Sequence, residues 1–399
     1  MKVLVADKFP EQRLADLTAL GAKVDYQPDV AVKDLPAAAA NAVVLVVRSK
    51  KVPAEVFDGA PALSLVVRAG AGVNTIDVAA ASRRGVYVAN CPGQNAIAVA
   101  ELAIGLLLAL DRRIPDNVQA LREGRWDKKT FSEASGLFGR AIGIAGLGAI
   151  GVETARRAAA LGMTVHAWSR SLDDARAKAL GVERAPDLET LASRVDALSL
   201  HLPLKPETRG AISRAVLEKL RPGALLVNTA RAEIVDQSAL LELAREGRIR
   251  VGTDVHAGEP EGGRAEFRSD LATLPGVYGT HHIGASTEQA QDAIARETVR
   301  IVSTFMRGGL VPNCVNVAKK TPARAKLVVR HHDKVGVLAN VLDAIREAGI
   351  NAQAIENTVF EQATAACCTI ELDEPPDRAL LDRIRSRRDE VIFVESFEL

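Results

Sequence analysis

The stretch AIGIAGLGAIG, residues 141–151, decides the fold expected for this chain. Its first half is a short apolar run typical of a buried strand, and residues 152–161 after it have helical character. The turn between strand and helix has the pattern G-x-G-x-x-G and consists of Gly146, Leu147, Gly148, Ala149, Ile150 and Gly151. The first glycine permits a sharp bend, the second lets a ligand approach the backbone, and the third lets helix and strand pack closely. A pyrophosphate can then bind the N–H groups of the helix N-terminus, so this stretch predicts a dinucleotide-binding unit.

Further apolar runs follow the glycine turn, and each ends in a polar loop. They are TVHAWS (164–169), ALSLHLP (197–203), ALLVNTA (224–230), VGTDVH (251–256) and VYGTHH (277–282). With the first strand they make six, the number of strands in a doubly wound dinucleotide-binding sheet. In the N-terminal region the runs KVLVA (2–6), AVVLVV (42–47) and LSLVVRAG (63–70) alternate with helix-compatible segments. That rhythm predicts a second parallel sheet with helices on both faces.

The C-terminal region has a different order of elements. Strand-like runs at 325–332, 352–360, 364–372 and 391–399 are interrupted by helical patterns at 335–348 and 377–387. The order β-α-β-β-α-β is that of a ferredoxin-like domain. We therefore expect an α/β chain with two doubly wound parallel-sheet, Rossmann-like domains and a C-terminal α+β ferredoxin-like domain.

Composition and charge exclude several classes of partner. A net charge of +1 gives no electrostatic basis for binding nucleic acid or an anionic membrane. The longest apolar stretch, 96–110, is interrupted by Glu101 and is too short to span a bilayer. The four cysteines lack metal-ligand spacing, which favours reduced thiols, and the N-terminus MKVLVADKF is unlike a signal peptide. We expect a cytoplasmic protein that binds no metal, nucleic acid or membrane.

The residues after the second strand of the dinucleotide unit should select the cofactor. NAD-binding units usually have a carboxylate there to hold the adenosine ribose, but this chain has Ser169 and Arg170. A guanidinium can bind a 2′-phosphate through charge-assisted hydrogen bonds, which favours NADP. Arg170 as a solvated surface charge would leave NAD as the cofactor. The sequence thus predicts NAD or NADP, with NADP at least tolerated.

Three polar residues follow late strands, at the edge where an open α/β sheet binds its ligands. They are Arg231, Glu259 and His282. A histidine can accept the proton of a secondary alcohol, and a neighbouring carboxylate can stabilise the resulting imidazolium. An arginine can hold a substrate carboxylate in a bidentate contact. This combination indicates hydride transfer between a dinucleotide and a hydroxy acid.

The string VNTARAEIVDQSALLELAREGRIRVGTDVHAGEP (227–260), followed by THHIGAST (280–287), resembles the D-isomer-specific 2-hydroxyacid dehydrogenases. The resemblance extends over about residues 1–315. It implies that Arg231 binds the substrate carboxylate, that Glu259 pairs with the base His282, and that Asp254 lies near the nicotinamide. It also implies a discontinuous substrate-binding domain, 1–95 with 286–315, around a dinucleotide-binding domain at 96–285. Further cofactor contacts implied by the family pattern are His201, Pro203, Thr208, Thr229, Ala230 and Gly284.

The chain departs from the family pattern at several positions. Ala232 replaces the usual glycine after the arginine, and His281 replaces the usual proline before the histidine. After Asp254 and Val255, where the family often has an aromatic and an acidic residue, the chain has His256 and Ala257. Two adjacent imidazoles, His281 and His282, leave open which one is the base, and the spacing to Ile283-Gly284 favours His282.

Basic residues in the N-terminal region suggest which hydroxy acid is bound. In phosphoglycerate dehydrogenases the positions matching Arg48, Lys50 and Lys128 are basic and surround a phosphate, although each could also be a solvated surface charge. The loop 68–74, with Ala71 and Gly72, resembles the substrate loop of the family, whose backbone N–H groups can bind a carboxylate. Asn95 is a further expected substrate contact. These features predict oxidation of 3-phospho-D-glycerate, the first step of L-serine synthesis.

Residues 324–399 resemble an ACT domain, a ligand-binding module of enzymes in amino-acid synthesis. By position, an L-serine effector would contact His331, Asp333 and Asn351, although Asp333 replaces an asparagine and Val335 a proline of the pattern. The alternative is a dimerisation module whose edge strands pair across subunits. Both predict a homodimer or homotetramer. The competing functions are an NADP-dependent glyoxylate or hydroxypyruvate reductase, which generally lacks this module, and a dinucleotide-sensing regulator.

Overall fold

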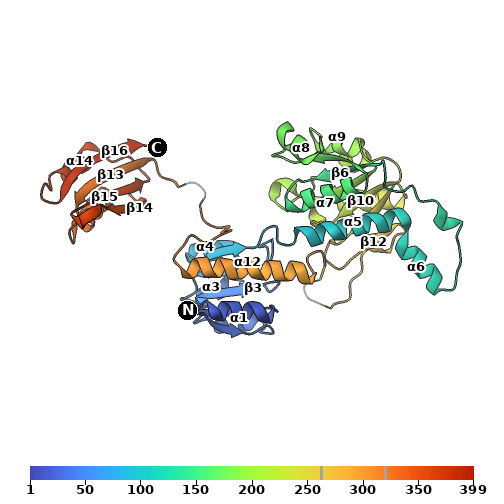
Figure 1. Cartoon of the computed structure of the whole chain (residues 1–399), viewed down its shortest axis with the longest axis horizontal. Helices are drawn as coiled ribbons and strands as arrows, with labels where there is room; N and C mark the ends of the chain where they lie inside the picture. Colours follow the sequence, from blue (N-terminus) through green and yellow to red (C-terminus); the bar gives the residue numbers. More distant parts are fainter. Residues whose placement is uncertain (261–263, 319–320) are drawn as a thin grey trace. The chain divides into compact units, whose positions relative to one another are not determined.

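The computed structural model describes residues 1–260, 264–318 and 321–399 (Figure 1). The chain divides into two compact units, Met1–Asn316 and Val317–Leu399. The larger unit contains a five-stranded and a seven-stranded sheet, both parallel, and the smaller unit contains a four-stranded antiparallel sheet. The predicted fold class is therefore confirmed. Within the described residues no helix is long and apolar enough to cross a membrane.

The first sheet has the order β2-β1-β3-β4-β5, a doubly wound arrangement. Its strands are β1 (Lys2–Val5), β2 (Lys23–Tyr26), β3 (Val44–Val47), β4 (Leu65–Arg68) and β5 (Tyr87–Asn90). The helices between them are α1 (Glu11–Ala19), α2 (Leu35–Ala39), α3 (Ala54–Gly59) and α4 (Val78–Arg83). Every residue of β3 is buried, because a central parallel strand is covered on both faces. The two edge strands, β2 and β5, were not predicted.

A helix from late in the chain completes the core of the first sheet. Figure 1 shows α12 (Glu288–Met306) among the N-terminal elements. Its buried residues Ile294 and Ile301 belong to the same apolar cluster as Val3 and Val44. The return of the chain after residue 287 therefore joins the N-terminal fold.

The second sheet has the order β12-β11-β10-β9-β6-β7-β8, and its strand order reverses between β6 and β9. Its strands are β6 (Ala141–Ala145), β7 (Thr164–Trp168), β8 (Glu183–Arg184), β9 (Ala197–Leu200), β10 (Ala224–Asn228), β11 (Ile249–Thr253) and β12 (Val277–Gly279). The two-residue β8 is additional to the six predicted strands. Such a reversal is the point at which doubly wound sheets bind their ligands.

Helices cover both faces of the second sheet. One apolar cluster includes residues of α5 (Ala96–Arg112), α7 (Ala149–Ala160) and α8 (Asp174–Leu180). The other includes residues of α9 (Leu188–Ser193), α10 (Arg214–Glu218) and α11 (Gln237–Arg245). The short helix α6 (Ile114–Arg122) follows α5 and precedes the connection into β6.

The smaller unit has the predicted β-α-β-β-α-β order, with sheet order β14-β15-β13-β16. Its elements are β13 (Ala325–His332), α13 (Val337–Glu347), β14 (Ala352–Val359), β15 (Ala365–Leu372), α14 (Arg378–Arg385) and β16 (Val391–Glu398). Alternate residues of β15 are buried, as expected for a sheet with helices on one face. The edge strand β14 is mostly exposed.

Candidate active site

The glycine turn has the geometry that a dinucleotide needs. A methyl group at Gly146, whose φ is +102°, would lie 2.7 Å from the backbone oxygen of His201, and one at Gly151 would lie 2.0 Å from the backbone oxygen of Gly146. A methyl group at Gly148 would meet no heavy atom within 4 Å. Helix α7 starts at Ala149 with no side-chain cap, so its first N–H groups are available to a pyrophosphate. Gly146 and Gly151 are thus required by packing, whereas Gly148 leaves the backbone open to a ligand.

Two of the predicted cofactor residues, His201 and Thr229, have buried polar atoms without a hydrogen-bond partner among the described residues. His201, at the end of β9, contacts Ser199 Oγ through Nε2 at 2.9 Å, and its Nδ1 has no partner. Burial lowers the pKa of His201 to about 3, so the imidazole is neutral at working pH. Thr229 Oγ1, after β10, is also buried without a partner. Unsatisfied buried groups are rare in folded proteins, and here they fit contacts to a bound ligand.

Other predicted cofactor residues have structural partners. Thr208 Oγ1 donates to the backbone oxygen of Pro203 at 2.5 Å and accepts from the Lys205 N–H at 2.8 Å. The Thr208 hydroxyl therefore stabilises the 203–208 loop. Ala230 donates its N–H to Asn228 Oδ1 at 3.0 Å, which shapes the turn before Arg231.

The end of β7 carries the residues expected to select the cofactor. Arg170 is exposed there, directly after Ser169. A second guanidinium, Arg176 on α8, donates to the backbone oxygen of Leu147 in the glycine turn at 3.0 Å. Arg176 was not predicted as a site residue, because nothing local in its helix indicates that it reaches the turn.

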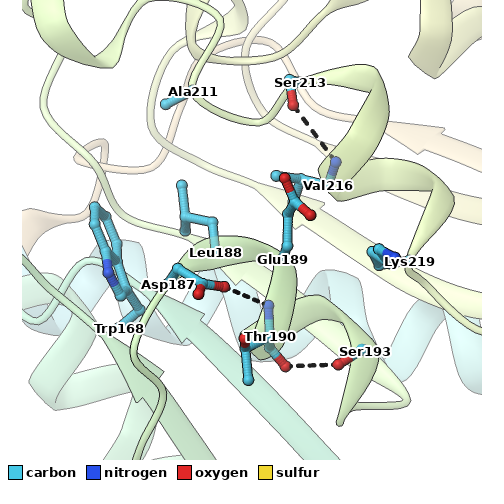
Figure 2. A pocket seen from close by; sticks show the side chains of 10 residues that line it. All are labelled: Trp168, Asp187, Leu188, Glu189, Thr190, Ser193, Ala211, Ser213, Val216 and Lys219. Atoms are coloured by element: carbon cyan, nitrogen blue, oxygen red, sulfur yellow. Dashed lines mark hydrogen bonds between the residues drawn. The ribbon is translucent and has the colours of Figure 1, made fainter.

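A pocket of about 720 Å³ lies beside the same strand end (Figure 2). The Trp168 ring lines one side of it. Asp187 accepts from the Thr190 N–H at 2.7 Å and Ser213 from the Val216 N–H at 3.4 Å, so both cap helices. These two side chains are therefore used by the fold, whereas the charged side chains of Glu189 and Lys219 also line the pocket.

The structure brings two of the predicted catalytic residues together. His282 Nδ1 lies 2.6 Å from Glu259 Oε1, and the two side chains are 43% and 37% exposed. His282 has φ +52°, a left-handed conformation that is uncommon outside glycine. Of the two adjacent imidazoles it is that of His282 which contacts the glutamate.

Asp254 holds the loop that carries His282. The residue is 1% exposed, and its carboxylate accepts from Thr280 Oγ1 at 2.5 Å and from the N–H groups of Ile283 and Gly284 at 2.8 Å each. The His282 N–H donates to the backbone oxygen of Asp254 at 2.8 Å. These contacts indicate a positioning role, in addition to the nicotinamide contact expected from the sequence.

Arginines from both sheets gather at the ends of β4 and β10. Arg231 donates to the backbone oxygen of Ala230 at 2.6 Å, and its Nη2 lies 3.5 Å from where a methyl group on Gly72 would sit. The guanidinium of Arg68 fills the space beside Gly70, and its Nε is buried without a partner. Desolvation, and then the positive charges of Arg231 and Arg48, lower the pKa of Arg68. Within the described residues, Arg48, Arg68 and Arg231 have no ion pair, so this arginine cluster is suited to bind anions.

Comparison with known proteins supports the relationship seen in the sequence. Residues 104–284 match the family model of the D-isomer specific 2-hydroxyacid dehydrogenase NAD-binding domain. The chain is 35% identical over 370 residues to a D-3-phosphoglycerate dehydrogenase of Archaeoglobus fulgidus, covering 90% of this chain and 69% of that protein. The chain belongs to the D-isomer-specific 2-hydroxyacid dehydrogenase family.

Other proteins similar to this chain are named as reductases rather than as phosphoglycerate dehydrogenases. A hydroxypyruvate reductase of Thermotoga maritima is 42% identical over 258 residues, which cover 64% of this chain and 82% of that protein. A glyoxylate/hydroxypyruvate reductase of Sinorhizobium meliloti, solved with NADP and malonate, is 29% identical, with a TM-score of 0.67 and coverage of 79% and 96%. The chain spans only 58–69% of the length of the curated phosphoglycerate dehydrogenases that it matches.

The remaining residues that the family pattern assigns to the substrate differ in whether other parts of the protein already occupy their polar groups. Lys50 donates its ammonium group to the backbone oxygens of Pro28, at 3.1 Å, and Val30. It therefore faces the 28–30 segment, and Arg48 alone of the turn's two predicted residues joins the arginine cluster. Lys128 is exposed in the connection before β6. Asn95 Oδ1, at the start of α5, is buried without a partner, and Ala71 accepts from Asn90 Nδ2 at 2.6 Å.

The expected effector residues lie in the smaller unit. His331 is 1% exposed and contacts the backbone oxygen of His332 at 2.8 Å and Asn357 Oδ1 at 3.2 Å. Both of its ring nitrogens are therefore used inside the unit. Asn351 donates its N–H to Asp373 Oδ1 at 2.9 Å, and Asp333 is exposed. Within the described residues no group of three or more histidine, cysteine, aspartate or glutamate side chains is placed to hold a metal ion.

Proposed function

We propose that this chain oxidises 3-phospho-D-glycerate to 3-phosphohydroxypyruvate with NAD or NADP, the first step of L-serine synthesis. The observation that carries the proposal is the arginine cluster Arg48, Arg68 and Arg231, which has no ion pair among the described residues. A substrate with a carboxylate and a phosphate would supply the two anions that such a cluster needs. The phosphoglycerate dehydrogenases among the relatives agree with this choice.

The site residues divide the proposed reaction between them. Arg231 would hold the substrate carboxylate, and the hydride would leave the hydroxyl-bearing carbon for the oxidised nicotinamide. His282 would take the hydroxyl proton on Nε2, because its Nδ1 contacts Glu259. The glutamate fixes the tautomer of the imidazole and stabilises the cation that forms. The bound dinucleotide supplies the hydride acceptor, and the glycine turn, His201 and Thr229 would hold it.

The domain roles follow from the two cores. We assign substrate binding to 1–95 with 286–315, because α12 packs into the N-terminal core, and dinucleotide binding to 96–285. The proposed site lies where Arg68 of the first part meets Arg231 of the second. Such a site is expected to close around its substrate and exclude water.

The choice between the proposed substrate and its rival can be measured. Steady-state kcat/KM should be compared for the oxidation of 3-phosphoglycerate and glycerate with NAD and NADP, and for the reduction of glyoxylate with NADH and NADPH. We expect the phosphorylated acid to be preferred. A kcat/KM for 3-phosphoglycerate no better than that for glycerate would contradict the phosphate assignment and leave the second candidate, a glyoxylate or hydroxypyruvate reductase. That candidate, as an NADP-dependent enzyme, is favoured by Ser169 and the exposed Arg170 at the end of β7.

Replacing Arg68 by glutamine tests the anion site separately from the chemistry. Because a hydrogen bond to a charged group contributes about 1.5–3 kcal/mol, Arg68→Gln should lower kcat/KM for 3-phosphoglycerate by roughly 10-fold or more. Glycerate, which lacks the phosphate, should lose less. Arg84→Gln, at an exposed ion pair with Asp58, is the control and should change neither value. Equal losses for both substrates would assign Arg68 to the carboxylate instead.

The cofactor preference is proposed to include NADP. Arg170→Ala should lower kcat/KM for NADP by about 10-fold and leave NAD nearly unchanged, since only the 2′-phosphate would be lost as a partner. Arg156→Ala, an exposed arginine paired with Glu153 on α7, is the matched control. The outcome against the proposal is an equal effect on both cofactors.

The smaller unit is proposed to be an ACT domain that joins copies of the chain into a homodimer or homotetramer. Its exposed edge strand β14, with Ile355 and Val359 50% and 48% exposed, is suited to pair with another copy. L-Serine as an effector would have Asp333 and Asn351 as its contacts rather than His331. If serine at millimolar concentration changes neither rate nor melting temperature, the effector role is wrong and the pairing role stands alone.

A further inference from the structure

His256 follows β11 and contacts both Glu259 and Thr280, a residue of the loop that carries His282. Its backbone N–H donates to Glu259 Oε2 at 3.3 Å, while Glu259 Oε1 contacts His282. Its ring Nε2 lies 2.9 Å from the backbone oxygen of Thr280, two residues before His282. The ring also packs edge-on against Phe267, with centroids 5.5 Å apart and planes at 64°. One residue therefore connects the glutamate with the loop that carries the histidine.

The loop needs such support because of its backbone. His282 has φ +52°, a conformation that costs free energy for a residue with a side chain and persists only where the surroundings hold it. On the buried side Asp254 holds the loop through Thr280 Oγ1 and the N–H groups of Ile283 and Gly284. The Thr280 N–H is held by the backbone oxygen of Thr253 at 2.9 Å. The hydroxyl and the N–H of Thr280 are thus used by other residues, and its carbonyl is the group that His256 contacts.

The strand before the loop leaves room for the imidazole. A methyl group on Gly279 would lie 3.1 Å from His256 Cε1, which is closer than most side-chain contacts, and 3.5 Å from its Nε2. Gly279 has no positive φ, so glycine is needed at this position to leave room for the His256 ring and not for its conformational freedom. The glycine, the imidazole and the Thr280 carbonyl thus form one packed arrangement.

We propose that His256 is a positioning residue that keeps Glu259 and His282 at the separation needed for proton transfer. The inference rests on the proposed function. The ring donates its Nε2–H to the Thr280 carbonyl and fixes the histidine loop, and the backbone N–H fixes the second oxygen of the glutamate. A phenylalanine at this position would fill the space but could not donate to Thr280.

Two variants of the full chain separate donation from packing. His256→Phe should lower kcat by about 10-fold, because small displacements of reacting groups are costly, while KM and Kd for the dinucleotide stay within about two-fold. His256→Gln keeps an N–H donor and should recover most of kcat. The pH profile of kcat/KM should move in His256→Phe and return toward that of the unchanged protein in His256→Gln.

A measurement without substrate keeps this test independent of the proposed reaction. The chain has seven histidines, so the ring resonances of His282 can be assigned by comparison with His282→Ala and compared between the variants by NMR. In His256→Phe the His282 ring resonances should shift, because the imidazole loses its fixed contact with Glu259, and in His256→Gln they should return toward those of the unchanged protein. Unchanged resonances together with unchanged kcat would overturn the proposal. So would equal losses in both variants with equally lowered melting temperatures, since that result means packing alone. If the unchanged protein neither oxidises 3-phosphoglycerate or glycerate nor reduces glyoxylate, the proposed function fails, whereas the NMR comparison still decides the role of His256.

Discussion

Replacing His282 by alanine is expected to lower kcat by about 10²–10⁴-fold, the usual contribution of a general base. The reason is geometric: its imidazole contacts Glu259 Oε1 at 2.6 Å through Nδ1, which leaves Nε2 for the hydroxyl proton of the substrate. The dinucleotide Kd should change little, because the pyrophosphate is expected at the glycine turn. Steady-state kinetics and equilibrium titration with the reduced dinucleotide measure the two quantities separately.

His281 provides the control for this variant. It is adjacent and also exposed, but the glutamate contact belongs to His282. His281→Ala should therefore keep kcat within a few-fold. The opposite result, a large loss in His281→Ala and a small one in His282→Ala, would assign the base to His281. The kcat of Glu259→Gln should lie between those of His281→Ala and His282→Ala. The glutamine keeps a hydrogen bond to His282 Nδ1 but loses the charge that stabilises the imidazolium.

Replacing Gly148 by valine is expected to weaken dinucleotide binding by about two orders of magnitude or more without unfolding the protein. The structure has open space around this position, since a methyl group there meets no heavy atom within 4 Å. The added side chain would instead occupy the space through which the pyrophosphate approaches the backbone. Binding is measured by titration with the reduced dinucleotide, and folding by the melting temperature.

Two other glycines make the interpretation specific. Gly151→Ala would place its methyl group 2.0 Å from the backbone oxygen of Gly146, so it should lower both the melting temperature and the affinity. Gly105, in the middle of α5, has free space around it, and Gly105→Ala should leave binding unchanged and stabilise the helix by about 0.5–1 kcal/mol. Unaltered binding in Gly148→Val would mean that the pyrophosphate does not lie at this turn.

The elements that sequence patterns missed share a physical feature. Strands β2, β5 and β8 were not predicted, and all three are edge strands, of which β2 and β8 have little buried surface. Strands are recognised in a sequence by the apolar residues that they bury. A short edge strand such as KVDY (23–26) buries few, so its sequence resembles that of a loop. The C-terminal unit, by contrast, was predicted element by element, because β13 and β15 alternate along their length and α13 has a buried apolar face.

The candidate site was predicted unevenly for a similar reason. Arg231, Glu259 and His282 follow strands of one sheet, so the position of strand ends was enough to group them. Arg68 ends a strand of the other sheet, and Arg176 lies within a helix, so neither stood out. The importance of His256 depends on its contact with Thr280, which is 24 residues away in the sequence.

The sequence by itself determined the class of fold, the glycine turn and the types of residue available for hydride transfer. These depend on interactions within a few residues, where apolar periodicity, the conformational freedom of glycine and the polarity of loops act directly. Only the tertiary structure decided that Gly148 faces open space while Gly146 and Gly151 are required by packing. It alone decided that Glu259 contacts His282, that Lys50 turns away, and that Arg68 joins Arg231. Those outcomes depend on which distant segments the two sheets bring together, and no local pattern in the chain encodes that.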